Sequence, residues 1–188
     1  MSTTVIGQEE AKKECIEGDL NKNLDCDSSF TIKGNIPDGL KVVCRGTLTV
    51  GGTVGSSEII CHGDLIVDKG FFAAGKSNVI VKGNLKTESI SGAQIEVEKN
   101  ITVKGNIINS IVKCRNNVSV GGAIEGGELA SASAVITRRI GKDGQTPDFT
   151  KVEAGTNFRL KVMYDEMDQE ISEISGKADK IRTAVQTL

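Results

Sequence analysis

The chain has 188 residues, which is enough for one domain of ordinary size or for one domain with an appendage. Its 25 acidic and 23 basic residues leave a formal net charge of −2, so there is no overall attraction to nucleic acid or to an anionic membrane. Aromatic residues make up only 3% and tryptophan is absent, which argues against a base-stacking platform or an aromatic glycan-binding groove.

The N-terminal stretch MSTTVIGQEEAKKEC has neither the basic leader nor the apolar segment of a signal peptide. No apolar run approaches the ~18 residues of a membrane span. We therefore expect a cytoplasmic protein with no direct membrane span and no nucleic-acid partner. The five cysteines form no CxxC pair, and in a reducing compartment they are expected to be free thiols.

An apolar–x–apolar pair recurs from residue 30 to residue 120 at intervals of about 16 to 20 residues. A corner rich in glycine or asparagine, one apolar residue and a third apolar segment follow most pairs. This alternation predicts short strands with one buried face. The six pairs are Phe30/Ile32, Leu48/Val50, Leu65/Val67, Leu85/Thr87, Ile101/Val103 and Val118/Val120.

Three short strands per unit predict a single-stranded parallel β-helix of about six to eight coils, with a narrow aliphatic core. The longest interval predicts a small outward loop at 72–76. A faint first coil is expected at Ile16, Leu20, Leu24 and Cys26, aligned with Ile32, Ile36, Leu40 and Val42, 16 residues later. A looser last coil is expected at about 130–155, using Ile136, Ile140, Phe149 and Val152.

Three cysteines, Cys44, Cys61 and Cys114, stand where Val81 and Val97 stand in other coils. We interpret them as small buried hydrophobes. The alternative is a redox pair formed by Cys44 and Cys61. It is disfavoured because the spacing between strands exceeds the usual Cβ separation of a disulfide.

A different pattern begins at about residue 156, where apolar residues alternate spacings of four and three over four heptads. This predicts a coiled-coil helix whose stripe forms an oligomer interface, and the alternative is an amphipathic helix lying on the β-stack. Acidic residues precede basic ones along this predicted helix. Two copies that pair antiparallel, centred near Ile174, would therefore place unlike charges opposite each other. The predicted interface residues are Leu160, Tyr164, Met167, Ile171, Ile174, Ala178, Ile181, Val185 and Leu188. The predicted divisions are an N-terminal cap and partial first coil over 1–27, a β-helix over 28–155 and the helix over 156–188.

Residues with catalytic chemistry are sparse. The only histidine, His62, follows an inward cysteine and is expected to point outward. A left-handed β-helix acyltransferase with this histidine as general base is the enzymatic alternative. The six-residue spacing of such enzymes is kept by Val42, Leu48, Val54, Ile60, Ile66 and Phe72 and is broken at Asn78. We predict no catalytic, cofactor-binding or metal site and no cofactor.

The stretch GGAIEGGELASASAVITRRIG at 121–141, followed by Thr150, Val152, Gly155 and a heptad helix, resembles the flagellar assembly protein A (FapA) family. The coils at 30–120 are also similar, more generically, to the polymer-forming bactofilins. The FapA resemblance implies a right-handed β-helix and a role in flagellar assembly or placement. The family's separate N-terminal domain, return helix and terminal strands have no counterpart here, so a reduced relative or a truncated segment is expected.

The sequence therefore predicts a non-enzymatic, self-assembling bacterial scaffold. Its expected partner is a second copy, bound through a coiled-coil dimer or through end-to-end contact of the β-helix. The alternative function is an adaptor that binds a flagellar or polar protein, and a hexapeptide-type acyltransferase ranks behind it.

Overall fold

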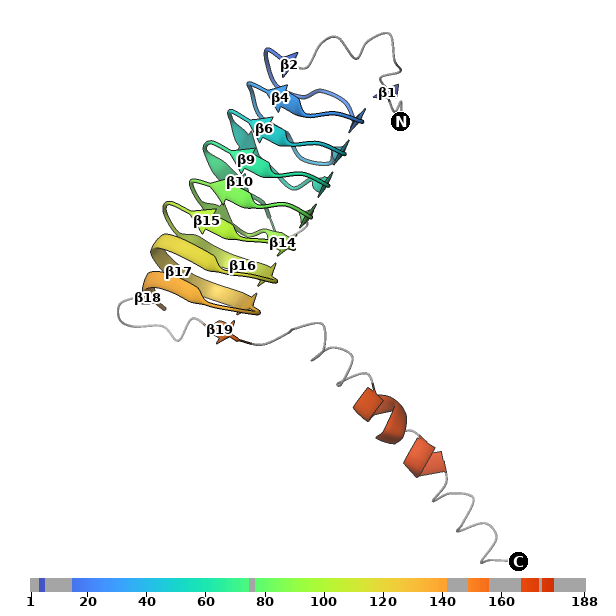
Figure 1. Cartoon of the computed structure of the whole chain (residues 1–188), viewed down its shortest axis with the longest axis vertical. Helices are drawn as coiled ribbons and strands as arrows, with labels where there is room; N and C mark the ends of the chain where they lie inside the picture. Colours follow the sequence, from blue (N-terminus) through green and yellow to red (C-terminus); the bar gives the residue numbers. More distant parts are fainter. Residues whose placement is uncertain are drawn as a thin grey trace, which may run out of the picture.

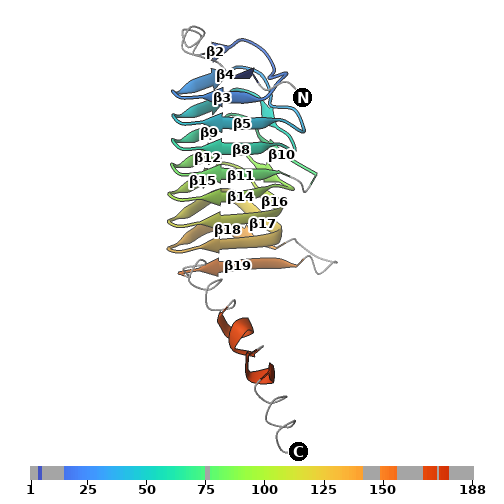
Figure 2. The ribbon, with the colours of Figure 1, turned by 90° about the vertical axis from the view of Figure 1, so that its right-hand side faces the viewer.

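The computed structural model describes residues 4–5, 15–74, 77–141, 149–155, 167–172 and 174–177. Between residues 15 and 155 the described chain winds into a parallel β-solenoid of about seven turns (Figures 1 and 2). Each turn contributes a short strand to each of three faces, and every strand pairs in parallel with the equivalent strand of the next turn.

The first face begins each turn with the predicted apolar pair. Its strands are β2 (Cys15–Ile16), β4 (Phe30–Ile32), β6 (Leu48–Val50), β9 (Leu65–Val67), β12 (Leu85–Thr87), β15 (Ile101–Val103) and the starts of β17 (Val118–Ser131) and β18 (Val135–Ile140).

The second face is the shortest and carries one inward residue per turn. It consists of a bridge between Ile36 and Val54, then β7 (Thr53–Val54), β10 (Gly70–Phe72), β13 (Ile90–Ser91), the start of β16 (Ile107–Cys114), the middle of β17 and the end of β18.

The third face closes each turn. Its strands are β1 (Thr4–Val5), β3 (Leu24–Cys26), β5 (Lys41–Cys44), β8 (Glu58–Cys61), β11 (Asn78–Val81), β14 (Gln94–Val97), the ends of β16 and β17, and β19 (Thr150–Ala154).

The predicted register of the repeat is confirmed from residue 30 to residue 120. Leu48 pairs with Phe30 on one side and with Leu65 on the other, and the same column continues through Leu85 and Ile101. The side chains of Leu48 and Leu65 are 0% exposed. Burying one such side chain stabilises the fold by about 1.5–3 kcal/mol, so stacking identical columns builds a continuous core from short strands.

The 20-residue interval has the predicted cause, because extra residues lie between β10 and β11, at 73–77. In the following turn, one inward residue was not predicted from the sequence. Ile90 lies three positions after the apolar pair instead of four, and it fills the column between Phe71 and Ile107.

The predicted register of the first coil is correct at Ile16 and at Leu20, which aligns with Ile36 in the second-face column, and it is wrong from Leu24 onward. Ile16 pairs with Ile32, but Leu24 pairs with Val42 and Cys26 with Cys44, both 18 residues later. The shift arises because the second coil has a longer corner before β5, at 37–39. Gly39 adopts a φ of +76° there, and Leu40 lies half-buried outside the strand.

The predicted alignment of the last coil is also corrected. Val135 and Thr137, not Ile136, continue the first-face columns of Val118 and Val120. Ile136 points outward and is 64% exposed. Ile140 and Val152 do continue inner columns, pairing with Ile124 and Leu129. Phe149 is 89% exposed and lies before the last strand.

Polar side chains form a ladder at the corner between the third and first faces. Asn84 donates its backbone N–H (2.7 Å) and its side-chain N–H (3.0 Å) to Asp64 Oδ1. Asn100 makes the same two contacts to Asn84, at 3.3 and 3.1 Å, and the Asn117 N–H follows at 3.3 Å. The ladder satisfies corner N–H groups that no neighbouring strand can reach.

Close stacking of the backbone explains a glycine in the same corner. A Cβ on Gly63 would lie 2.5 Å from the carbonyl oxygen of Gly46 in the turn before it. No side chain fits at this separation, so neighbouring turns approach at full interstrand contact only with glycine at this position.

The C-terminal helix is described at residues 167–172 and 174–177, which are helical and exposed. This part agrees with the predicted helix over 156–188, and the remainder lies outside the described residues. Coiled-coil pairing and the right-handed winding implied by the FapA resemblance remain predictions.

Candidate interaction interface

Three predicted interface residues lie on the described helix. Met167, Ile171 and Ile174 are 53%, 60% and 65% exposed, and their spacing of four and three places them on one side of an α-helix. The remaining predicted residues, Leu160, Tyr164, Ala178, Ile181, Val185 and Leu188, lie outside the described residues. The described part therefore carries an exposed aliphatic stripe of about one heptad.

The last turn of the solenoid has no further described turn stacked on it. Ile140 continues the second-face column but is 54% exposed, whereas Ile124, one turn earlier, is 1% exposed. Val152 continues the third-face column and is only half-buried. The last turn thus presents core side chains that no further described turn covers.

The N-terminal end is better covered at its second and third faces, although Ile16 on its first face is half-buried. Leu20 and Leu24 belong to the first turn, yet they are 1% and 4% exposed. β1 pairs in parallel with β3, with Thr4 opposite Leu24, and extends the third face by one strand beyond the first turn. Strand addition therefore already occupies the edge at this end of the third face.

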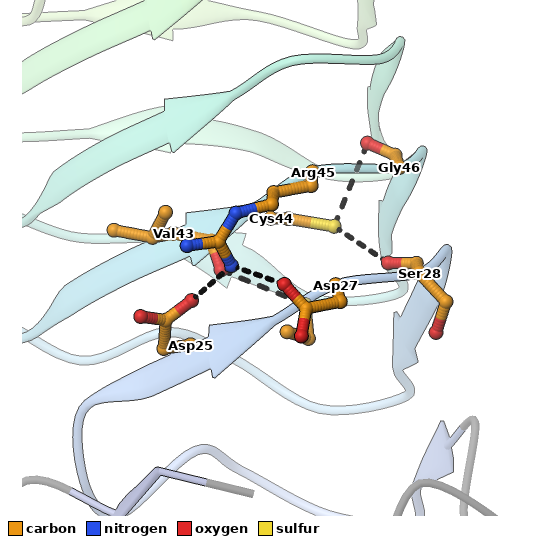
Figure 3. A network of polar contacts seen from close by, with 8 residues as sticks. Asp25, Asp27, Ser28, Val43, Cys44, Arg45 and Gly46 are labelled. Atoms are coloured by element: carbon orange, nitrogen blue, oxygen red, sulfur yellow. Dashed lines mark hydrogen bonds and ion pairs between the residues drawn. The ribbon is translucent and has the colours of Figure 1, made fainter. Parts of the chain in front are cut away.

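Ion pairs join neighbouring turns on the surface. Arg45 extends from the corner after β5 to Asp25 (2.8 Å) and Asp27 in the preceding turn (Figure 3). The acid precedes the base along the stack in this group and in Glu17–Lys33, Glu88–Lys104, Glu98–Arg115, Glu125–Arg139 and Glu128–Lys151. Lys41–Glu58 has the opposite order. Most of these pairs are solvent-exposed, so each of the exposed pairs stabilises the fold by no more than about 1 kcal/mol, whereas the Glu125 side chain is only 18% exposed.

The cysteines that were predicted to be buried are buried. Cys44, Cys61 and Cys114 are 0% exposed, and Cys26, which sequence reasoning left out, joins Cys44 and Cys61 in one column. All five cysteines are free. Each column thiol approaches a backbone carbonyl, such as Cys44 Sγ to Ser28 O at 3.3 Å, so this thiol donates to the corner of the preceding turn.

The thiol pKa values follow from this environment. Burial raises the pKa of Cys114. Hydrogen bonding to Cys44 and then burial raise the pKa of Cys26 and Cys61, while hydrogen bonds from these two neighbours lower the pKa of Cys44. The raised pKa values favour neutral thiols at Cys26, Cys61 and Cys114, which fits a structural role.

The residues considered for enzymatic chemistry do not converge. His62 is exposed in the corner after β8, as predicted. The six-residue spacing has no structural counterpart, because Val42, Leu48 and Val54 are buried whereas Ile60 and Ile66 alternate outward. Within the described residues no group of three or more metal-ligating side chains gathers. Nor is any described helix long and apolar enough to cross a membrane.

These features define a parallel β-solenoid protein with an exposed helical extension. The model of the Flagellar Assembly Protein A β-solenoid domain matches residues 17–188. The chain therefore belongs to the FapA family, as its sequence resemblance indicated. Searches of curated proteins and of solved structures found no match.

Proposed function

We propose that this protein is a non-enzymatic cytoplasmic scaffold that self-associates through its C-terminal helix and acts in flagellar assembly or placement. The observation that carries the proposal is the exposed stripe of Met167, Ile171 and Ile174. Exposed aliphatic side chains at heptad spacing are stabilised when a second helix covers them. Family membership supports the flagellar setting.

The solenoid suits a scaffold because its surface is repetitive and its core is built from aliphatic columns. In this role the solenoid acts as a rigid spacer. It holds a partner bound to the C-terminal helix at a fixed distance from a partner bound at the N-terminal end. The right-handed winding and the domain boundaries at 27 and 155 belong to the same proposal.

The test is the mass of the full chain in solution, measured by light scattering across a dilution series. Ile171→Asp combined with Ile174→Asp places two carboxylates in the paired stripe, so the dissociation constant is expected to rise at least 100-fold, about 2.8 kcal/mol. The matched control is Gln169→Asp with Ser172→Asp, which adds the same charge to exposed helical positions off the stripe. An unchanged mass in the stripe variant contradicts the proposal.

An adaptor that offers the same stripe to a helix of a flagellar or polar protein is the second candidate. The segregated charges of the helix favour a partner with the opposite order of charges. In this case the purified chain stays monomeric at all concentrations, and a mixture with the partner forms a complex that the stripe variant abolishes and the control variant preserves.

A further inference from the structure

We propose that β19 is a contact strand through which two copies of this chain pair tail to tail and antiparallel, with Val152 at the two-fold axis. The inference rests on the self-association proposed above and names a surface for it other than the helix. It follows from the open edge of β19, from the order of its residues and from the closed state of the opposite end.

β19 is paired on one side only. It runs parallel to the end of β17, with Thr150 opposite Gly127 and Val152 opposite Leu129, and no other described strand pairs with it. Thr150, Val152 and Ala154 continue inner columns, while Lys151 and Glu153 point outward. The half-buried Val152 has Leu129 on one side and no described strand on the other, so a further strand would complete its burial.

The order of residues in β19 is self-complementary. When two such strands pair antiparallel about Val152, Lys151 lies opposite Glu153 of the second copy, and Glu153 lies opposite the second Lys151. On the inner side Val152 meets its own copy, and Thr150 meets Ala154. Directly opposed unlike charges stabilise an antiparallel pair, and like charges destabilise it. A two-fold interface requires this kind of self-matching.

The same two-fold operation accommodates the other faces. An axis through the middle of the third face exchanges the first and second faces of the two copies. β18 supplies the last strand of both faces, so β18 of one copy meets β18 of the other. The exposed Ile140 would then be covered at the contact, together with the half-buried Val135.

Parallel, head-to-tail stacking is less compatible with the structure. The end that would receive the open edge already has β1 paired to β3, and its core residues Leu20 and Leu24 are buried. A second copy would have to displace β1 to continue the stack. Tail-to-tail pairing displaces nothing among the described strands, and it produces a closed dimer instead of a filament.

The first experiment reverses charges on β19 in the full chain that also carries Ile171→Asp and Ile174→Asp, so that the helix stripe is disabled. Lys151→Glu alone, or Glu153→Lys alone, places like charges opposite each other twice per dimer. Each single reversal is expected to raise the dissociation constant of the dimer at least tenfold. Added salt screens the repulsion between like charges and should make this rise smaller. The double reversal should restore dimers, but it also restores the Lys151–Glu153 ion pair within each chain. The decisive test is a one-to-one mixture of the two single variants, in which unlike charges meet only across the dimer, and this mixture should restore dimers.

Folding is checked separately because Lys151 also forms ion pairs within its own chain, with Glu128 at 3.1 Å and with Glu153 at 3.2 Å. Each variant is compared by circular dichroism and thermal unfolding. Glu128→Gln is the matched control: it removes the Lys151–Glu128 ion pair, keeps both charges of β19, and should leave the dissociation constant within twofold.

The second experiment tests the register by disulfide formation under a mild oxidant. Val152→Cys chains should cross-link to one another because residue 152 faces its own copy. Thr150→Cys chains and Ala154→Cys chains should each fail to cross-link alone, and should cross-link when they are mixed.

The outcomes separate this inference from the proposed function. Dimers that survive the helix substitutions and respond to charge reversal support β19 pairing, even if the helix proposal fails. A chain that becomes wholly monomeric with the helix substitutions supports the helix and overturns β19 pairing. Charge variants that all behave alike, a mixture that fails to restore dimers, or mass that grows into open polymers also overturn it.

Discussion

The two ends of the solenoid share the second-face column of core side chains, yet among the described residues this column is buried at one end only. At the N-terminal end Leu20 is 1% exposed, whereas at the C-terminal end Ile140, in the same second-face column, is 54% exposed. The interior turns do not differ in this way, because each has a neighbour on both sides. The comparison shows that the interactions of a solenoid end are decided by what covers its last turn, not by the repeat itself.

Truncating the same column at its two ends should give the largest contrast. Leu20→Ala removes a fully buried side chain and should lower the free energy of unfolding by about 2–4 kcal/mol, whereas Ile140→Ala should lower it by less than about 1 kcal/mol. Urea denaturation measures both values. Equal losses at the two ends would contradict the comparison, and the measurement belongs at concentrations where the chain is monomeric.

Alanine substitutions at two glycines compare the stability cost of close stacking between interior turns with the cost in the last turn. Gly63→Ala places a Cβ against the backbone of the preceding turn and should cost about 2–3 kcal/mol. Gly141 lies in the open last turn with a φ of +84° and nothing within 4 Å of an added Cβ, so Gly141→Ala should cost only about 1–2 kcal/mol of backbone strain. Thermal unfolding of the two variants checks the order, and a greater loss at Gly141 would refute the argument from close stacking.

Weakening the pairing of β1 with β3 should leave the first turn of the solenoid less protected. Val5→Pro removes the backbone donor at a residue that pairs with Asp25 and should cost about 1 kcal/mol. The more specific effect is on hydrogen exchange, because the amides of β3 should exchange about tenfold faster while those of β8 stay protected. Val135→Pro at the first residue of β18 is the control at the other end, and it should leave exchange in β3 unchanged.

Strand register could be predicted from the sequence where the repeat has neighbours on both sides. Leu48, Leu65 and Ile101 each align with several similar units, so an error in one turn conflicts with the next. The terminal turns lack this check. The long corner at 37–39 shifted the first alignment by two residues, and the outward Ile136 was taken for an inward residue.

Hydrophobicity alone does not separate inward from outward positions. Val43, Ile60 and Ile80 lie on the outer surface of the third face, in register with one another and between buried neighbours. The candidate helix stripe was predictable because heptad spacing is visible in sequence. The open edge of β19 was not, since it depends on which strand comes last and on the order of pairing in space.

The smallest expected effect concerns the thiols, which also differ between the ends. The column position that holds Cys26, Cys44 and Cys61 near the closed end holds Ser131 near the open one, and Ser131 Oγ donates to Asn116 O. Both residue types supply a hydrogen-bond donor to the corner carbonyls, but only a thiol loses its proton at moderately alkaline pH in the unfolded chain.

Cys114, between these positions, gives the sign of the pH dependence. Burial raises its pKa in the folded chain, so the unfolded chain loses its proton first. The stability from the neutral thiol is complete below the ordinary thiol pKa of about 8.5 and is lost as pH rises from there through the folded value. Cys114→Val, which matches Val97 in the preceding turn, should flatten the decline in unfolding free energy between pH 8 and 10. An equally steep decline in this variant would show that Cys114 does not contribute to it.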